Sequence, residues 1–250
     1  MKKVLVIGDS CQDMFRYGTC DRLSPEAPVA VMKPTRTVGN GGMAINVYEN
    51  IKALGVDCDI ITNDIRPVKT RYVDEVSNQM LLRVDESDEI QQINLELFKK
   101  IKFDDYHAVV VSDYDKGFLS EIDIESIADH HPLVFMDTKK KVDGWVNGVE
   151  FIKINEKEFN ENWTKGFDYC GDLVTTTGKN GALLNFYEIF PIEEEHEVRD
   201  LSGAGDTFLA ALVANYVIFN DICASIKFAN RCAAWVVSQK GVVVVNPEKI

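Results

Sequence analysis

The sequence predicts a three-layer α/β/α fold with a mostly parallel central sheet, and three observations support this prediction. Apolar runs of strand length recur without alternating polar residues, which is typical of strands buried on both faces of a parallel sheet. Between them lie segments with apolar residues at three- and four-residue spacing, the pattern of amphipathic helices. Strands and helices therefore alternate along the chain, as they do when helices cover a sheet. With 250 residues, 46% of them hydrophobic, the chain can bury a sizeable core.

The predicted core elements follow one another in this order. A helix over 46–55 ends at Gly55, which suits the left-handed conformation of a C-cap. The segment 78–101 changes from strand to helix near Asp85, and 155–162 begins a short helix. The core strands are expected at 4–7, 108–112, 132–137, 151–154 and 172–177, and the C-terminal part is expected to be helical over 205–219 and 221–241.

Two further segments alternate polar and apolar residues and are rich in β-branched side chains. Residues 27–38 and 68–84 are therefore predicted as half-exposed antiparallel strands rather than core strands. They would form a small sheet that projects from the main layer. The apolar face of such a sheet needs a cover, which a ligand or a second subunit would provide.

The charge of the chain argues against two classes of partner. Its formal net charge is -13 at pH 7, whereas proteins that bind nucleic acids or membrane surfaces need a basic field to attract phosphates. We therefore expect no nucleic-acid partner and no membrane partner, and any anionic ligand must be held by a local site. The six cysteines are far apart and have no C-x-x-C spacing, which fits reduced thiols and a cytoplasmic location rather than a zinc site.

The stretch DLSGAGDTF, residues 200–208, combines small residues with the start of an apolar helix. Gly203, Ala204 and Gly205 let backbone N–H groups approach a ligand, and the helix dipole favours negative charge at the same place. The pattern predicts an anion hole with Asp206 beside it. Ordinary helix capping also explains a bare G-x-G-D sequence, because aspartate is common in first turns.

Four motifs, in the same order, resemble those of the ribokinase-like, PfkB-type carbohydrate kinases. DLSGAGDTF is similar to the family's D-T-x-G-A-G-D run, with Ser202 where threonine or another small residue is usual. GGMAIN (41–46) resembles the G-G-x-x-x-N motif at the sugar site, and NEKE (155–158) resembles the N-x-x-E motif near the metal and phosphates. TTTGKNGALL (175–184) resembles the nucleotide-side T-x-G-x-x-G segment.

The resemblance implies a single ribokinase-like kinase domain over residues 1–250 that transfers the γ-phosphoryl group of ATP to a sugar hydroxyl. Asp206 would remove the proton from that hydroxyl, and the N–H groups of Gly203 to Gly205 would stabilise charge on the transferred group. The nucleotide-binding residues implied by the family motifs are Asn155, Thr177, Gly178, Gly181 and Asn230. The helix that carries Asn230 also reads as an ordinary core helix.

A magnesium ion that bridges the nucleotide phosphates is expected as well. By resemblance it would be held largely through water, with Asn155 and Glu158 nearby. The spacing of these two residues is also that of a helix capping box, which needs no metal.

Within the family, five further segments resemble kinases that phosphorylate heptose 7-phosphate at the anomeric position. In such kinases the projecting strands form a lid and a dimer contact, so we expect lid strands over about 14–38 and 66–85 and a homodimer. The implied substrate is D-glycero-D-manno-heptose 7-phosphate. The segments are RLSPEAPVAVMK (22–33), KTRYV (69–73), NQMLLRVD (78–85), VVSDYDKGFLS (110–120) and MDTKKKV (136–142).

The substrate-binding set follows from the same resemblance and from side-chain chemistry. Asp13 can accept two sugar hydroxyls, and arginines suit a phosphate group through bidentate contacts. Lid strands carry charged residues by default, so each arginine also has an ordinary surface explanation, as does Lys116 in its loop. The candidates are Asp13, Gly42, Asn46, Arg71, Arg83, Asp113 and Lys116.

The chain departs from the family pattern between 51–62 and 67–73. Family members usually have a further strand–helix unit here, with a G-x-D motif, before the second lid strand. The core is therefore expected to be shorter by about one strand–helix unit, which bears on substrate identity and lid geometry.

Three other functions compete with a sugar kinase. Gly8-Asp9-Ser10 resembles the nucleophile block of SGNH esterases, with 62–64 and 104–107 imitating two further blocks, but the base block lies too far from the C-terminus for that fold. A sugar- or nucleotide-binding relative without turnover is the second alternative. A nucleoside kinase of the same superfamily is the third.

Overall fold

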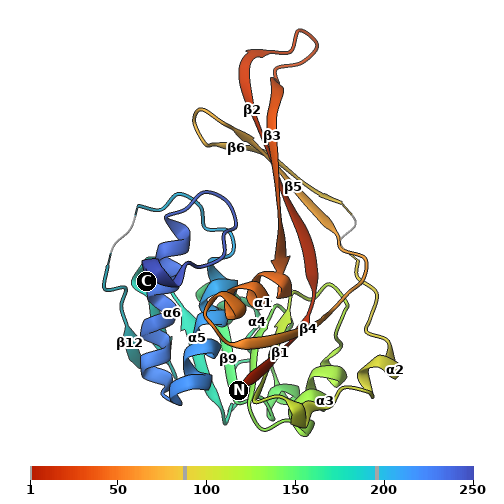
Figure 1. Ribbon diagram of the computed structural model, residues 1–250, viewed down its shortest axis with the longest axis vertical. Coiled ribbons are helices and arrows are strands. Elements are labelled where there is room, and N and C mark those ends of the chain that lie inside the picture. Colours follow the sequence, from red (N-terminus) through yellow and green to blue (C-terminus); the bar gives the residue numbers. More distant parts are fainter. Residues whose placement is uncertain (1, 87–88, 195–196) are drawn as a thin grey trace.

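The computed structural model describes residues 2–86, 89–194 and 197–250. Figure 1 shows a body in which helices cover a central sheet, and a second sheet that extends away from this body. In the described residues no helix combines the length and apolar character needed to cross a membrane.

The main sheet has eight strands and is mostly parallel, as predicted. The strands are β1 (Lys3–Gly8), β4 (Asp57–Thr62), β7 (Ala108–Asp113), β8 (Val134–Thr138), β9 (Phe151–Asn155), β10 (Asp172–Thr176), β11 (Ala182–Leu184) and β12 (Glu188–Phe190). Their order is β12-β11-β10-β9-β8-β7-β1-β4. Neighbours from β10 to β4 run parallel, whereas β10, β11 and β12 are antiparallel to one another.

Side chains of the central strands are buried on both faces of the sheet, which explains their uninterrupted apolar sequences. In β1, Val4 and Val6 belong to one core cluster, and Leu5 and Ile7 belong to the other. The first cluster packs beneath α1 (Ala44–Ala53), α5 (Ala204–Phe219) and α6 (Ile222–Val237). The second packs beneath α3 (Glu121–His130) and the chain around it. The three-layer prediction is therefore confirmed.

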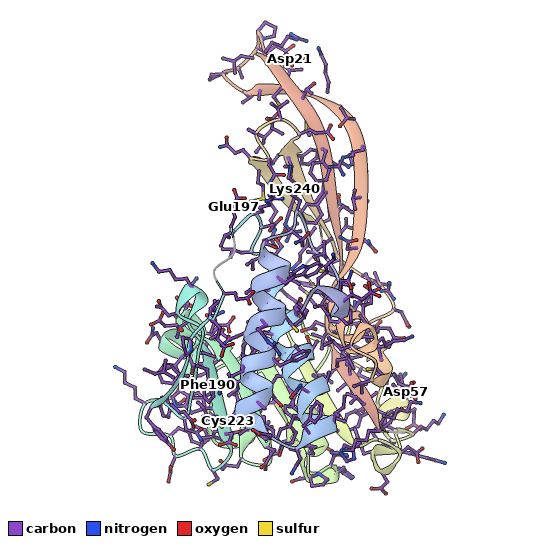
Figure 2. The ribbon with its side chains drawn as sticks, turned by 60° about the vertical axis from the view of Figure 1, so that its left-hand side comes forward. Asp21, Asp57, Phe190, Glu197, Cys223 and Lys240 are labelled. Atoms are coloured by element: carbon purple, nitrogen blue, oxygen red, sulfur yellow. The ribbon has the colours of Figure 1, made fainter. Side chains whose placement is uncertain are left out.

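The projecting sheet consists of β2 (Ser10–Leu23), β3 (Ala30–Met43), β5 (Val68–Asp74) and β6 (Met80–Glu86), in the order β3-β2-β5-β6. It confirms the second sheet expected from the alternating segments. Figure 2 shows Asp21 at the outer end of this sheet, far from Asp57 and Phe190 in the body. Near the body, Phe15, Tyr17 and Val73 form a small apolar cluster with Val242.

The prediction that a helix begins near Asp85 is wrong. After β6, the residues from 89 to 94 lie outside regular structure, and only α2 (Leu95–Phe98) is helical. The backbone N–H groups of Ile90 and Ile93 donate to the carbonyl oxygens of Lys116 and Phe118, at 2.9 Å each. Both isoleucines are buried, so packing against the loop after β7 overrides the local helical pattern.

The shortened core is visible between β4 and β5. The chain passes from one sheet to the other through residues 63–67, with no strand–helix unit anywhere within 57–74, all of which the structure describes. The Asn63 side chain secures this passage, because its Nδ2 donates to the carbonyl oxygens of Ser10 and Ile65.

The carboxyl ends of the parallel strands meet along one edge of the main sheet. Asp9 follows β1, Asp113 ends β7, Asp137 lies in β8, Asn155 ends β9 and Thr177 follows β10. Open α/β sheets bind their ligands outside this edge. The helix α4 (Glu156–Asn162) begins at the same edge.

Candidate active site

Asp206 lies in the first turn of α5 with donors on both carboxylate oxygens. Asn46 Nδ2 donates to Oδ2 at 3.1 Å, and the Tyr114 hydroxyl donates to Oδ1 at 2.6 Å. Asn46 is in turn fixed by Asn50, whose Nδ2 donates to the Asn46 side-chain oxygen at 2.9 Å. Three elements distant in sequence therefore position one buried carboxylate.

The surroundings of Asp206 keep its proton affinity high. Burial raises the pKa of Asp206 to about 6, while the hydrogen bonds from Tyr114 and Asn46 act in the opposite direction. The negative charge of Asp137 also raises this pKa, and the positive charge of Lys153 lowers it. Burial and the nearby Asp206 raise the pKa of Tyr114 well above its ordinary value, so the phenol remains a hydrogen-bond donor.

Two glycines of the GAG run are required by what lies next to them. Gly203 has a left-handed φ of 80°, and a Cβ there would lie 2.8 Å from Asn46 Nδ2. A Cβ on Gly205 would lie 3.0 Å from Lys153 Nζ. The start of α5 therefore stays free of side chains between Asn46 on one side and Lys153 on the other, as an anion hole requires.

A chain of four alternating charges runs from Lys153 across the carboxyl edge. Lys153 Nζ lies 2.6 Å from Asp137 Oδ2, and both side chains are nearly fully buried. Lys139 Nζ lies 3.0 Å from the other oxygen of Asp137 and contacts Glu158. These carboxylates raise the pKa of Lys139, so it stays cationic.

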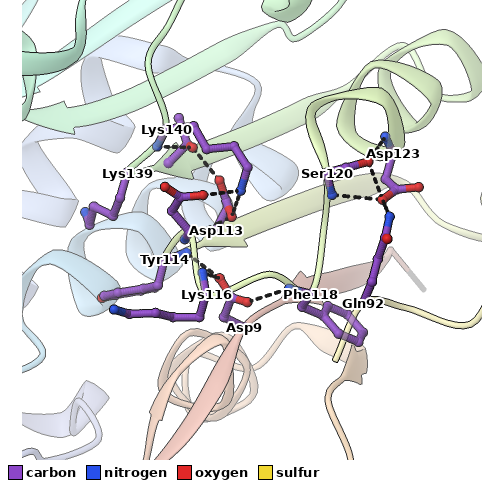
Figure 3. A network of polar contacts seen from close by, with 12 residues as sticks. Asp9, Gln92, Asp113, Tyr114, Lys116, Phe118, Ser120, Asp123, Lys139 and Lys140 are labelled. Atoms are coloured by element: carbon purple, nitrogen blue, oxygen red, sulfur yellow. Dashed lines mark hydrogen bonds and ion pairs between the residues drawn. The ribbon is translucent and has the colours of Figure 1, made fainter. Parts of the chain in front are cut away.

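The loop after β7 is held by two buried aspartates (Figure 3). The Asp9 carboxylate accepts the backbone N–H groups of Tyr114, Lys116 and Phe118 at 2.7, 3.3 and 3.1 Å. This arrangement aims the Tyr114 side chain toward Asp206. Figure 3 shows the side chains of Tyr114, Lys116 and Lys139 extending in the same direction.

Asp113, a candidate for sugar binding, connects this loop to β8. Its carboxylate accepts the Thr138 hydroxyl and the backbone N–H of Asp115, and it pairs with Lys140 at 2.7 Å. Burial raises the pKa of Asp113 although Lys140 opposes the shift. The structure thus gives Asp113 a clear part in fixing the loop that carries Tyr114 and Lys116.

At the base of the projecting sheet, the buried Asp13 on β2 and the half-buried Arg71 on β5 form an ion pair. Gly42, on β3, lies against them, since a Cβ at this position would be 2.2 Å from Asp13 Oδ2. Arg83 lies opposite Arg71 in the β5–β6 register and forms a bidentate pair with Asp85 at 2.7 and 2.8 Å. Both arginines therefore face one side of the sheet near Asp13.

Cys11 lies beside Asp13, with its thiol 3.8 Å from Asp13 Oδ2. Burial raises the pKa of this thiol to about 12, the negative charges of Asp13 and Asp206 add to the effect, and the positive charges of Lys69 and Arg71 oppose it. The thiol therefore stays protonated in this position.

At the nucleotide end, the turn between β10 and β11 and the helix α6 meet. Thr177 donates its N–H and hydroxyl to the carbonyl oxygen of Gly181, at 2.8 and 3.1 Å. Gly178 and Gly181 both have positive φ, and a Cβ on Gly181 would clash with the carbonyl oxygen of Phe190. Asn230 Nδ2 donates to the same Phe190 oxygen at 2.8 Å.

A small hollow of about 80 Å³ opens beside Asn230, between α6 and the chain after β12. Its lining includes Pro191, Lys227, Arg231, Trp235 and the C-terminal Ile250. Four of the five residues named from the nucleotide-side motifs, all except Asn155, therefore lie around the turn after β10 and the Phe190 carbonyl group, and Asn230 also lines the hollow.

Asn155 and Glu158 form the capping box of α4. Asn155 Oδ1 accepts the Glu158 N–H, and Glu158 Oε2 accepts the Asn155 N–H, both at 2.9 Å. Glu158 Oε1 contacts Lys139. In the described residues no group of three or more acidic, histidine or cysteine side chains could hold a metal ion. Both side chains are thus fixed at the carboxyl edge of the sheet by capping and, for Glu158, by the ion pair with Lys139.

The hydrolase alternative is wrong. Ser10 is fully buried, and its hydroxyl accepts a hydrogen bond from Thr62 at 2.6 Å rather than from a histidine. His107 precedes β7, and β1 and β7 are parallel with Val4 opposite Ala108, so His107 lies at the opposite edge of the sheet from Ser10. Asn63 binds the backbone of Ser10 and so holds a turn.

Sequence reasoning missed several functional candidates. Tyr114 stands inside the SDYDKG segment, but only its neighbours Asp113 and Lys116 were selected there. Asn50 could have been selected, because it follows Asn46 by four residues and therefore lies on the same face of the predicted helix. Lys153 and Asp137 lie within predicted core strands, where a charged residue signals a buried pair.

Comparison with known proteins places these features in a family context. Residues 85–249 match the family model described as pfkB family carbohydrate kinase. The bifunctional protein HldE of Helicobacter pylori is 30% identical over 308 aligned positions, which cover 100% of this chain and 66% of the relative. The chain thus spans just under two thirds of that relative's length. The alignment is longer than the 250 residues of this chain, in agreement with the shortened core.

Two solved structures share the fold at low sequence identity. The ribokinase from Thermotoga maritima aligns with a TM-score of 0.72 and 15% identity, covering 99% of this chain and 98% of the other. The Arabidopsis thaliana ribokinase complexed with ribose and ATP aligns with a TM-score of 0.69 and 13% identity, covering 98% and 97%. The fold is therefore ribokinase-like, as the sequence motifs implied.

Proposed function

The chain belongs to the pfkB family of carbohydrate kinases, and from this premise we propose that it transfers the γ-phosphoryl group of ATP to the anomeric hydroxyl of D-glycero-D-manno-heptose 7-phosphate. One observation carries the mechanism: the buried carboxylate of Asp206, held by Asn46 and Tyr114 at the start of α5. The choice of sugar rests on the resemblance of the segments that contain Arg71, Arg83 and the SDYDKG loop, and it agrees with the similarity to HldE.

Asp206 acts as the general base. Its carboxylate takes the proton of the sugar hydroxyl while the hydroxyl oxygen forms a bond to the γ-phosphorus, and the bond from that phosphorus to the oxygen bridging to the β-phosphate breaks. ADP leaves with the electron pair of the broken bond. A pKa of about 6 keeps most Asp206 ionised at neutral pH and still basic enough to accept a proton.

The start of α5 is the anion hole. Phosphoryl transfer demands mostly positioning and charge stabilisation, which N–H groups of Gly203, Ala204 and Gly205 supply at a helix N-terminus. Side chains at the two glycines would crowd Asn46 and Lys153 at this place, and glycine keeps the backbone N–H groups accessible to the phosphoryl group. The nucleotide extends from there toward Asn155, Thr177, Gly178, Gly181 and Asn230.

Magnesium accompanies the nucleotide. Bound to the phosphates, it would neutralise charge on the groups that separate during transfer. Asn155 and Glu158 would hold its water ligands from the start of α4, where their capping box fixes both side chains.

The base of the projecting sheet binds the sugar phosphate. Asp13 accepts sugar hydroxyls beside Gly42, and the guanidinium groups of Arg71 and Arg83 bind the phosphate already on the sugar. Asn46 contacts the sugar from the Asp206 side. Asp113 and Lys116, on the loop that carries Tyr114, complete the set.

The outer part of the projecting sheet forms a homodimer contact. Its edge strands β3 and β6 have unpaired backbone groups, and exposed edges of this kind pair readily with another chain. Several of its apolar side chains are exposed and need a cover, namely Leu23, Val29, Val38, Met80, Leu81, Leu82 and Val84. Sedimentation analysis of the protein and of a Leu82→Glu variant tests this contact, and a concentration-independent monomer would refute it.

The kinase assay uses MgATP with heptose 7-phosphate, fructose, ribose, fructose 6-phosphate and adenosine, and measures ADP release. We expect the highest kcat/KM with heptose 7-phosphate. A preference for adenosine would instead indicate a nucleoside kinase, and ligand binding without ADP release would indicate a relative that has lost turnover.

An Asp206→Asn variant tests the general base. We expect kcat to fall about 10²- to 10⁴-fold, the usual contribution of a positioned general base. Calorimetric binding of ADP serves as the control and should stay unchanged. Full activity in this variant would remove Asp206 from the role of base.

A further inference from the structure

Lys153 holds a positive charge that the mechanism above does not use. Its side chain is 3% exposed and lies in β9, the fourth strand from the nucleotide-side edge of the main sheet. Asp137 Oδ2 is the acceptor of its ammonium group, at 2.6 Å, and among the described residues Lys153 has no second hydrogen-bond acceptor. An ammonium group has three N–H donors, so hydrogen-bonding capacity remains in a place that is closed to bulk water.

The ammonium group points at the start of α5. Lys153 Nζ would be 3.0 Å from a Cβ on Gly205, the last glycine of the GAG run. The glycine thus leaves open the space between the ammonium group and the backbone N–H groups of the helix. Two sources of positive potential, the helix N-terminus and Lys153, face this one space.

The pair of Lys153 with Asp137 is a costly arrangement for stability alone. Removing two charges from water costs several kcal/mol per ion, and well-packed apolar residues often stabilise a core equally or better. Asp137 is moreover shared, because its other oxygen is 3.0 Å from Lys139. Lys139 in turn pairs with Glu158, so Lys153 is the one cation of this chain of charges that lies next to the start of α5.

We propose that Lys153 completes the anion hole, with its Nζ contacting an oxygen of the γ-phosphoryl group as this group moves from ATP to the sugar hydroxyl. This inference rests on the proposed kinase function and adds a side-chain cation to an anion hole otherwise made of backbone N–H groups. Asp137 orients the ammonium group as a positioning residue. The Asp137 carboxylate and the Lys153 ammonium group neither gain nor lose a proton during the reaction, so the only proton transferred goes from the sugar hydroxyl to Asp206.

The test is a Lys153→Met variant, which keeps the length and apolar stem of the side chain and removes its charge. We expect kcat to fall about 10²- to 10³-fold, the usual effect of losing one preorganised donor to a developing negative charge. Affinity for ADP, measured by calorimetry, should change less than about threefold, since ADP lacks the γ-phosphoryl group. Lys3→Met is the control, because Lys3 also pairs with an aspartate, Asp59, at 2.7 Å but lies at the start of β1, at the edge of the main sheet opposite the anion hole.

Asp206 supplies a second readout that a merely structural lysine would not move. Tyr114, Asp137, Lys153 and Cys11 are the titratable groups whose charges or hydrogen bonds act on or respond to Asp206. Removing the cation at residue 153 takes away a group that favours the ionised carboxylate, so the acid limb of the kcat/KM profile should move to higher pH. The Lys3→Met profile should keep its position.

In Lys153→Met the buried Asp137 keeps only Lys139 as a partner, which weakens the folded state, so a Lys153→Met, Asp137→Asn double variant removes both charges of the pair together. Circular dichroism and thermal unfolding identify the folded variant to assay. A folded variant lacking Lys153 with wild-type kcat overturns the inference, and so does an equal loss of kcat and ADP affinity. If the wild-type protein phosphorylates no sugar, the proposed function itself fails, which is a different outcome.

Discussion

In the main sheet, β7 and β8 bury every residue, whereas in the projecting sheet every residue of β6 and most residues of β3 are exposed. The main sheet is covered by helices on both faces, and its strands are stabilised by burial of apolar side chains. The projecting sheet has only the small cluster around Phe15 and Val242, near the body.

The two sheets also divide the proposed chemistry between them. Asp206, Lys153 and the anion hole lie on elements packed into the body, where side chains have little freedom. Arg71 and Arg83 lie on the projecting sheet, which can vary in sequence without disturbing the core. Substitutions in the body should therefore change kcat or stability, whereas substitutions in the projecting sheet should change KM.

The largest expected difference concerns stability. Phe135→Ala, at a fully buried position of β8, should lower the free energy of unfolding by about 3–5 kcal/mol, because it leaves a cavity in the core. Thr37→Ala, at an exposed position of β3 outside the proposed dimer contact, should change it by less than about 0.5 kcal/mol. Urea unfolding followed by circular dichroism measures both. Equal losses would contradict the contrast between the two sheets.

The pH dependence of Asp206 is the next largest effect. Because burial raises the pKa of Asp206 to about 6, the folded protein holds this proton more tightly than the unfolded chain does. Its contribution to stability is complete below about pH 4 and is lost as the pH rises through 6, a total of about 3 kcal/mol. The base is ionised only above this range, so kcat/KM should fall about tenfold per pH unit below pH 6.

Urea unfolding at pH 4.5 and pH 7.5 isolates this group when wild type and Asp206→Asn are compared. The wild type should lose more stability with rising pH than the variant. Parallel pH profiles of stability in the two proteins would show that Asp206 has an ordinary pKa, and the acid limb of kcat/KM would then have another origin.

The projecting sheet should produce a smaller effect, confined to substrate binding. Arg71→Met removes a charged hydrogen-bond partner, so KM for heptose 7-phosphate should rise about 10- to 100-fold with kcat little changed. Arg83→Met, whose side chain is 42% exposed and paired with Asp85, should raise KM less. A fall in kcat of the same size as the rise in KM would mean that Arg71 also stabilises the transition state, and it would contradict the expected division of roles between the two sheets.

The smallest effect separates the two readings of the N-x-x-E motif. Asn155→Ala should lower the free energy of unfolding by about 1 kcal/mol through loss of the N-cap of α4. Asp221→Ala, at the N-cap of α6, is the matched control with the same kind of loss. If Asn155 also holds the magnesium ion, only Asn155→Ala should raise the magnesium concentration needed for half-maximal activity. Identical magnesium dependence in both variants would mean that Asn155 serves only as the N-cap of α4 and does not hold the magnesium ion.

Much of the fold could be predicted because its signals are local. Uninterrupted apolar runs indicate strands buried on both faces, as in β1, β7, β8, β9 and β10. Alternating polar and apolar residues indicate burial on one face, as in the projecting strands. The helix expected after Asp85 failed because the backbone of Ile90 and Ile93 finds partners in the loop after β7, which no local pattern reveals. The short passage between β4 and β5 was predicted by comparison with the family pattern, because the few residues between 51–62 and 67–73 leave no room for the usual strand–helix unit.

The candidate site was predicted where a motif fixes both residue type and spacing, as for Asp206 and the GAG run. Residues that act through contacts between distant strands were missed. Tyr114 is directed toward Asp206 because Asp9, more than 100 positions earlier in the chain, accepts a hydrogen bond from the Tyr114 backbone N–H and so fixes the loop. Lys153 and Asp137 come from neighbouring strands, and their pairing is a property of sheet order rather than of sequence spacing.

The way β2 leaves the body has a mechanical consequence. A single residue, Asp9, separates the end of β1 from the start of β2, and β3 runs directly into α1, so neither strand has a flexible hinge. With 14 residues, β2 is a lever arm roughly 46 Å long at about 3.3 Å per residue. A tilt of about 5° at its base would swing the tip by roughly 4 Å and Asp13 by only about 1 Å, on the same rise per residue. Displacements of the outer end are thus scaled down about fourfold before they reach Asp13, so the proposed dimer contact can shift while the proposed sugar site stays nearly in place.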